Sequence, residues 1–130
     1  MNNKDSFTVV NDQKGTPTFA GDLARAVRKF IELGDTGTPA PYGVYHCTDL
    51  GQTNWYEFAR EIRKVGTETG LVTHECTVHP CTTAEYPTKA VRPAYSVLSK
   101  DKIQHALGIT LPQWQESLQV FMQSPLYWKE

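Results

Sequence analysis

The chain has 130 residues and a formal net charge of −1, with 39% hydrophobic and 21% charged residues. This length suits one domain with its own core, and the composition is that of an ordinary folded protein. Acidic and basic residues are interspersed, so no global charge draws the chain to nucleic acid or to a membrane surface. No apolar run approaches ~18 residues, and a transmembrane helix is therefore not expected.

The N-terminus and the cysteines indicate a compartment. The opening MNNKDSF has no apolar segment of the kind that signal peptides carry. Three cysteines, Cys47, Cys76 and Cys81, are an odd number without a C-x-x-C pair. Because unpaired thiols suit a reducing environment, we expect a cytoplasmic protein.

The first third of the chain predicts a strand and a helix. Residues 7–10 (FTVV) are β-branched and aromatic, and a turn-rich loop follows at 11–18. A helix is expected from about Ala20, with Asp22 beside its positive end and Gly34 as its stop. The apolar residues expected on its buried face are Leu23, Ala26, Val27, Phe30 and Leu33.

The middle of the chain predicts a strand, a helix and a further strand. Residues 43–48 (GVYHCT) are predicted to form a central strand between turn residues. Asn54 is expected to cap a helix, with Glu57 in the capping-box position. The residues that follow at helical spacing are Trp55, Phe58, Ala59, Ile62 and Val65, all of which we expect in the core. Residues 75–78 are a candidate strand.

Two short helices are expected near the C-terminus. Ser99 is predicted to cap the first, which would end at Gly108. Pro112 is predicted to begin the second. Their apolar residues are Ile103, Ala106 and Leu107 in the first helix and Trp114, Leu118, Phe121 and Met122 in the second. We therefore predict one small α/β (α+β-like) domain over residues 1–130, with too few strands for a complete Rossmann sheet.

A long segment at 82–98 (TTAEYPTKAVRPAYSVL) has neither a sustained helical nor a strand period. Pro87 and Pro93 remove backbone donors from it. Its side chains available for burial are Tyr86, Val91, Tyr95, Val97 and Leu98, so we expect an ordered loop. Arg92, directly before Pro93, suits bidentate recognition of a phosphate. The alternative is an ordinary surface or salt-bridge arginine.

A second loop offers small polar groups. Gln13, Gly15, Thr16 and Thr18, with Pro17 among them, are candidates for contacts to a ligand. The alternative is that residues 11–18 only connect a strand to a helix.

His74, Cys76, His79 and Cys81 are ligand types that zinc prefers. Their spacing is poor for a metal site, and we favour an edge strand with a buried thiol.

Several signatures of nucleotide-dependent enzymes are missing from these 130 residues. Neither G-x-G-x-x-G nor G-x-x-x-x-G-K-[ST] occurs, so no Gly-rich phosphate loop is encoded. Neither H-E-x-x-H nor G-x-S-x-G occurs. Tyr86 and Lys89 are one residue too close for the Tyr-x-x-x-Lys pair of short-chain dehydrogenases. The chain does not read as a complete enzyme.

Six motifs in order resemble the C-terminal part of the dTDP-4-dehydrorhamnose reductases, which are extended short-chain dehydrogenases/reductases. They are VVNDQKGTPT at 9–18, DLARAV at 22–27, GVYHCT at 43–48, NWYEFAREI at 54–62, TTAEYPTKAVRPAYSVLSKDKI at 82–103 and LPQWQESL at 111–118. Each motif alone is weak, but the ordered set is specific.

The resemblance implies the half of the enzyme that closes on a dTDP-sugar. The catalytic residues and the NAD(P)H site would belong to an N-terminal Rossmann domain, so no catalytic residue is assigned here and no cofactor is expected on this chain alone. By analogy, Arg92 would contact the substrate diphosphate, and the loop from Gln13 to Thr18 would lie near the sugar cleft. Some members bind Mg²⁺ through glutamates at a dimer contact. Gly21 stands where such a glutamate is expected, which leaves Mg²⁺ in doubt, and a homodimer is allowed.

A second hypothesis is a non-catalytic regulatory or interaction subunit, because the regulatory β subunit of methionine adenosyltransferase resembles the same reductases.

Overall fold

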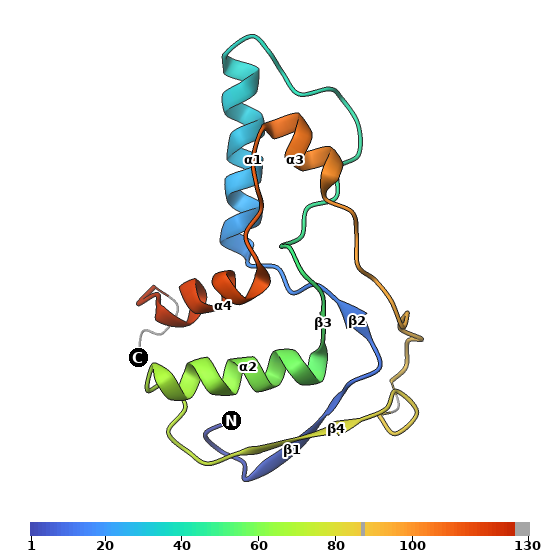
Figure 1. Cartoon of the computed structure of the whole chain (residues 1–130), viewed down its shortest axis with the longest axis vertical. Coiled ribbons are helices and arrows are strands. Elements are labelled where there is room, and N and C mark those ends of the chain that lie inside the picture. The colour runs from blue at the N-terminus through green and yellow to red at the C-terminus, as the bar shows by residue number, and fades with distance from the viewer. Residues whose placement is uncertain (87, 127–130) are drawn as a thin grey trace.

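The computed structural model describes residues 1–86 and 88–126, and these hold four helices and four short strands. The helices are α1 (Ala20–Asp35), α2 (Trp55–Glu68), α3 (Asp101–Leu107) and α4 (Trp114–Gln123). Figure 1 shows α1 and α3 together at one end of the molecule, and α2 with α4 at the other. The mixed α/β class predicted from the sequence is confirmed. Pro87, one of the two loop prolines, lies outside the described residues.

The strands form two separate pairs. β1 (Ser6–Val10) pairs in parallel with β4 (Thr77–Cys81), so that Val9 lies opposite Pro80. The candidate strand at 75–78 therefore lies two to three residues further along than we predicted. It runs through Pro80, which a two-stranded sheet tolerates because each strand has a free edge. β2 (Lys14–Gly15) pairs antiparallel with β3 (Thr53–Asn54).

One core forms between α2 and α4. The predicted cap is confirmed, because Asn54 Oδ1 accepts a hydrogen bond of 2.8 Å from the Glu57 backbone N–H. The buried residues are Val65, Trp114, Leu118 and Met122, with Phe58, Ile62, Leu71 and Phe121 packed against them. The sequence period thus identifies most of the core residues of both helices correctly. Trp55 is the exception, since its side chain is 49% exposed.

A second core joins α1 to α3. Ala26 packs with Ile103, Leu107 and Leu111, and Phe30 and Leu33 lie against them. Asp22 is in the first turn of α1, as expected for a helix N-terminus, and it also accepts a hydrogen bond of 2.7 Å from Ser117 Oγ of α4. That bond ties the two ends of the domain together.

Two predictions for α1 are wrong. Leu23 and Val27 are 44% and 51% exposed, and neither belongs to the core that Ala26, Phe30 and Leu33 form with α3 and the segments around Tyr45 and Leu111. Gly34 does not stop the helix, which continues to Asp35 and ends at a C-cap on Thr36.

The predicted central strand at 43–48 is also wrong. No residue from 43 to 48 pairs in a β-ladder. The centroid of the Tyr45 ring instead lies 5.0 Å from that of the Phe30 ring. Lys102 Nζ lies over the same Tyr45 ring, 4.5 Å from its centroid. Lys102 Nζ also donates a hydrogen bond of 2.7 Å to the Val44 carbonyl. The Tyr45 ring therefore packs on helices while Val44 is exposed, and no strand among the described residues pairs with this segment.

The boundaries of the last two helices differ slightly from those expected. The N-cap of α3 is Lys100 and not the predicted Ser99. Ser99 lies one residue earlier, and its Oγ accepts a hydrogen bond of 3.3 Å from the Asp101 N–H. Gly108 ends α3 in the left-handed conformation at φ 61°, as predicted. α4 begins at Trp114 behind a capping box made by Gln113 and Glu116, so Pro112 precedes the helix.

Candidate functional site

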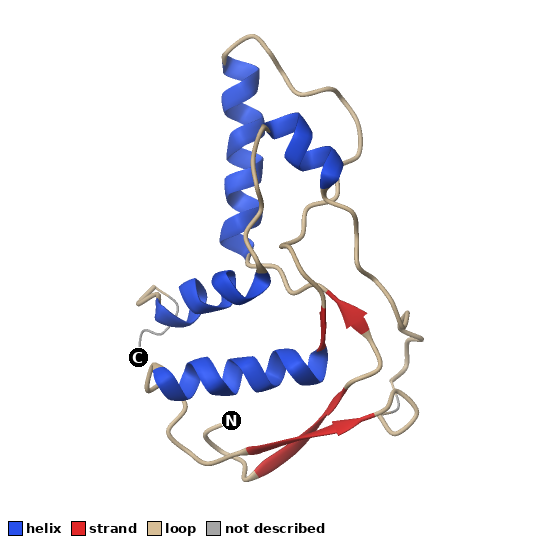
Figure 2. Cartoon of the chain, viewed as in Figure 1, coloured by secondary structure: helices blue, strands red, loops and turns tan. Residues whose placement is uncertain are grey.

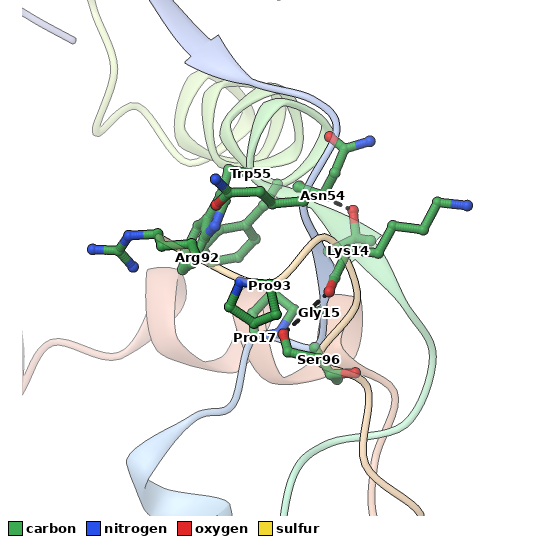
Figure 3. Close-up of a pocket in the computed structure, with 12 residues that line it drawn as sticks. Lys14, Gly15, Pro17, Asn54, Trp55, Arg92, Pro93 and Ser96 are labelled. Carbon is green, nitrogen blue, oxygen red and sulfur yellow. Dashed lines mark hydrogen bonds between the residues drawn. The ribbon is translucent and has the colours of Figure 1, made fainter. Parts of the chain in front are cut away.

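The candidate site is a pocket of about 190 Å³ where β2, β3, the start of α2 and the segment 92–96 meet (Figure 3). Its walls come from three parts of the chain that lie far apart in sequence. The lining residues are Gln13, Lys14, Gly15, Thr16, Pro17, Thr53, Asn54, Trp55, Phe58, Arg92, Pro93 and Ser96. The pocket therefore combines aromatic and proline surfaces with seven polar or charged residues, which can fix the orientation of a bound ligand.

The segment 94–96 is fastened to β2 by backbone hydrogen bonds. The Lys14 N–H donates to the Ala94 carbonyl at 2.8 Å, and the Ser96 N–H donates to the Lys14 carbonyl at 2.9 Å. Ser96 Oγ donates to the same carbonyl at 3.1 Å. A Cβ on Gly15 would lie only 3.1 Å from Ser96 Oγ, so a glycine here permits the close approach. The two loops thus form one continuous wall.

The long loop is held by these bonds, and little of it is buried. Figure 2 shows the chain between β4 and α3 as loop along the side of the molecule. Tyr86, Val91, Tyr95 and Leu98 are all exposed, and only Val97 is half-buried. Our expectation that burial orders this loop is wrong. Hydrogen bonds hold it instead, from residues 94–96 to β2 and from Thr83 to Asp12, and its apolar side chains stay mostly on the surface.

Five of the six candidate residues line this one pocket: Gln13, Gly15, Thr16, Pro17 and Arg92. Thr18 lines a neighbouring pocket that shares Pro17 and Phe58 with the first. Thr16 Oγ1 donates a hydrogen bond of 2.8 Å to the Gly51 carbonyl, so its hydroxyl hydrogen serves the fold. Two loops that the sequence marked separately are therefore brought together.

Arg92 is exposed, and within the described residues it makes no ion pair or hydrogen bond. Figure 3 shows its guanidinium extending outward from the pocket, while the Lys14 ammonium points away on the other side. The described part of the chain gives no support to the salt-bridge alternative. The guanidinium is available to an anion at the pocket entrance.

Seven lining residues were not among the predicted candidates: Lys14, Thr53, Asn54, Trp55, Phe58, Pro93 and Ser96. Trp55 is the most informative of them. It fits the apolar period of α2, so we expected it in the core, but it lies at the first helical position, beside β3. Its ring packs edge-on at 6.5 Å from Phe58, and both rings line the pocket. A signal was available: residues in the first turn of a helix adjoin the preceding loop, so an apolar residue there can face a loop-lined site.

The neighbouring pocket, of about 280 Å³, is mostly apolar and has Asp49 in its wall. Asp49 is 1% exposed. Its Oδ2 accepts from the Phe19 N–H at 3.2 Å, but Oδ1 has no hydrogen-bond partner among the described residues. Burial raises the pKa of Asp49, and the Phe19 N–H, the Ser117 hydroxyl and the charges of Arg25 and Lys100 oppose that shift only in part. The ionised carboxylate therefore destabilises the fold.

The substitution Asp49→Asn is expected to raise the free energy of unfolding at neutral pH by about 1 kcal/mol, because it removes a buried, half-satisfied charge and keeps an acceptor for Phe19. Since the folded-state pKa is raised, the gain is full above that pKa, shrinks as pH falls through it, and vanishes below the unfolded value of about 3.9. Urea unfolding from neutral to acid pH measures this. The exposed Asp35→Asn is the control, and a loss of stability in Asp49→Asn at neutral pH would contradict the argument.

The expectation about Mg²⁺, which the resemblance places at a contact between two chains, stays a prediction. Gly21 offers no side-chain oxygen, and a side chain there would collide with the Phe19 ring. No group of three or more His, Cys, Asp or Glu side chains among the described residues could hold a metal. In the His/Cys segment, Cys76 is fully buried and His74 Nε2 lies 2.9 Å from Asp5 Oδ1.

Among the described helices, none has the length and hydrophobicity that a membrane crossing needs.

Fold and pocket together define a small α/β ligand-binding domain, with a guanidinium and an exposed indole at the entrance of one cleft. Residues 1–126 match the family described as the RmlD substrate binding domain, and the chain belongs to that family.

Relatives and solved structures agree with this assignment. The chain is 40% identical over 116 residues to a dTDP-4-dehydrorhamnose reductase of Aggregatibacter actinomycetemcomitans, covering 89% of this chain and 40% of the relative. It is 42% identical over 120 residues to the spore coat polysaccharide biosynthesis protein SpsK of Bacillus subtilis, covering 92% and 38%.

A crystal structure of a dTDP-4-dehydrorhamnose reductase from Clostridium acetobutylicum superposes with a TM-score of 0.76 at 41% identity, covering 92% of this chain and 38% of that one. The Bacillus anthracis reductase in complex with NADP gives a TM-score of 0.74 at 30% identity, covering 92% and 37%. The chain therefore spans about two fifths of the length of the relatives that it matches.

Proposed function

We propose that this chain is the dTDP-sugar-binding domain of a reductase that converts dTDP-4-dehydro-β-L-rhamnose to dTDP-β-L-rhamnose with NAD(P)H. The observation that carries the proposal is the convergence of Arg92 with the loop Gln13–Pro17 in one pocket of a domain of the RmlD substrate binding family. The names of the matched relatives as reductases support the catalytic interpretation over a regulatory subunit.

The pocket has the groups that a nucleoside diphosphate sugar needs. The Arg92 guanidinium can pair in a bidentate manner with the diphosphate, and its exposure means that it loses no existing partner on binding. The half-exposed Trp55 indole offers a flat face for the thymine ring. Gln13 and the Gly15 backbone line the same pocket and can contact the sugar.

The hydride donor would be bound by another part of the full-length protein. The chain has no Gly-rich nucleotide loop and no Tyr-x-x-x-Lys pair. A matched reductase is in complex with NADP, and this chain covers only 37% of it. We therefore assign substrate binding to these 130 residues and hydride transfer to an N-terminal Rossmann domain.

The chain alone is expected to bind dTDP weakly, with a dissociation constant in the high micromolar to millimolar range, because one wall of the cleft is missing. It is expected to oxidise no NADPH when the dehydro-sugar nucleotide is supplied. Isothermal titration calorimetry with dTDP and an absorbance assay with NADPH measure the two results. Titration with GDP is the control for general anion binding. NADPH-dependent turnover by this chain, or equal affinity for GDP and dTDP, would refute the proposal.

A further inference from the structure

The turn that begins the long loop is docked onto the residue before Gln13. The Thr83 N–H donates to both carboxylate oxygens of Asp12, at 3.1 and 3.0 Å, and Thr83 Oγ1 donates to Asp12 Oδ1 at 2.7 Å. The backbone N–H of Thr83, followed by its hydroxyl, lowers the pKa of Asp12, so this carboxyl is ionised at neutral pH. An ionised carboxylate can only accept hydrogen bonds.

Counting hydrogens then fixes the orientation of the Gln13 amide. A threonine hydroxyl has one hydrogen, and that of Thr83 is donated to Asp12. Toward Gln13, Thr83 Oγ1 can therefore only accept. Gln13 Nε2 lies 3.0 Å away and donates to it. The reversed amide would bring two acceptors together, so Nε2 must face Thr83.

The same counting leaves the Gln13 carbonyl oxygen without a protein partner. Gln13 is buried and lines the pocket. Among the described residues, no donor reaches its Oε1. A carbonyl acceptor is repelled by phosphate oxygens, and it requires a hydroxyl or N–H donor on the ligand.

We infer that Thr83 is a positioning residue, which, held by Asp12, orients the Gln13 amide so that its carbonyl oxygen accepts a hydrogen bond from a donor group of the bound nucleotide sugar. The inference rests on the proposed function and deepens it. The pocket then has opposite requirements at two points, an anion beside Arg92 and a hydrogen-bond donor beside Gln13. Two donors fit this chemistry: a hydroxyl of the hexose, and the N–H or hydroxyl groups of the thymidine part.

The substitution Thr83→Val removes the hydroxyl at nearly constant shape and lets the amide turn. We expect affinity for dTDP-rhamnose to fall about five- to tenfold, as for the loss of one oriented hydrogen bond. Thr83→Ser, which keeps the hydroxyl, should bind dTDP-rhamnose within about twofold of the wild-type affinity. Thr82→Val is the matched control, because the neighbouring Thr82 hydroxyl donates to Glu85 at 2.8 Å and has no bond to Gln13.

A second variant guards against a simple loss of folding. Asp12→Asn retains an acceptor for the Thr83 N–H, but its amide can also donate, which frees the Thr83 hydroxyl hydrogen for Gln13 and permits the reversed amide. A smaller loss of about threefold is expected. Thermal unfolding of each variant shows whether affinity merely follows stability, in which case Thr82→Val and Thr83→Ser would weaken binding in step.

Calorimetric titration of all variants with dTDP and with dTDP-rhamnose distinguishes the outcomes. A loss confined to dTDP-rhamnose supports the inference with the donor on the hexose, and an equal loss for dTDP supports it with the donor on the thymidine part. If Thr83→Val and Asp12→Asn both keep wild-type affinity for both ligands, the inference is overturned. If wild-type protein binds neither ligand, the proposed function fails instead.

Discussion

Replacing Trp114 with alanine is expected to destabilise the domain by about 3–5 kcal/mol, the range typical of a buried tryptophan truncated to alanine. Trp114 is 6% exposed and lies in the core between α2 and α4. Its ring meets the Phe58 ring edge-on at 5.7 Å, which adds to the area that it buries. Because small domains have total stabilities of about 5–15 kcal/mol, the variant should lose a large share of its folding free energy.

Trp55→Ala provides a matched control at the other tryptophan that contacts Phe58. Trp55 is half-exposed at the start of α2, and its ring is 6.5 Å from Phe58. We expect a loss of at most about 1 kcal/mol in stability. Affinity for dTDP should fall roughly tenfold, since stacking of a base on an aromatic ring contributes about 1–3 kcal/mol. Urea unfolding and calorimetric titration measure the two effects. A stability loss for Trp55→Ala equal to that of Trp114→Ala would contradict the assignment of Trp55 to the pocket.

The contrast between these tryptophans shows what sequence periodicity could and could not predict. Both fit an apolar helical stripe, and most residues of the two stripes lie in the core between α2 and α4. The period identifies the face of the helix on which a residue lies, however. It does not tell whether another element packs against that face at the position of the residue along the helix. Trp55 faces a loop-lined pocket at the helix start, and Val27 is 51% exposed.

The same limit explains the strand at 43–48. β-branched and aromatic residues indicate a preference for an extended backbone, but a strand also requires a neighbour with free N–H and C=O groups. The neighbours of Tyr45 are Phe30 and Lys102 on helices. For the site, composition and resemblance identified the two loops separately. Their convergence depends on the pairing of Lys14 with residues 94–96, a contact across about 80 residues that no local pattern encodes.

Arg92→Ala is expected to weaken dTDP binding by about 10–100-fold, because hydrogen bonds to charged groups contribute about 1.5–3 kcal/mol. Arg92→Lys should recover only part of this loss, since an ammonium keeps the charge but lacks the planar fork. Thymidine, which has no diphosphate, should bind equally to both variants and to the wild type. Because Arg92 is exposed and has no ion pair among the described residues, stability should change by less than about 0.5 kcal/mol.

The control for Arg92 lies in the same loop. Lys89 is exposed and does not line the pocket, so Lys89→Ala changes the net charge equally without removing a pocket group. If Lys89→Ala weakens dTDP binding as much as Arg92→Ala, then general attraction explains the effect, and such attraction should also disappear in high salt. A contact at one guanidinium predicts a different pattern. Affinity should fall for Arg92→Ala but not for Lys89→Ala, and for dTDP but not for thymidine. Most of the difference in affinity between Arg92→Ala and the wild type should remain as ionic strength rises. This pattern would place the diphosphate beside Arg92.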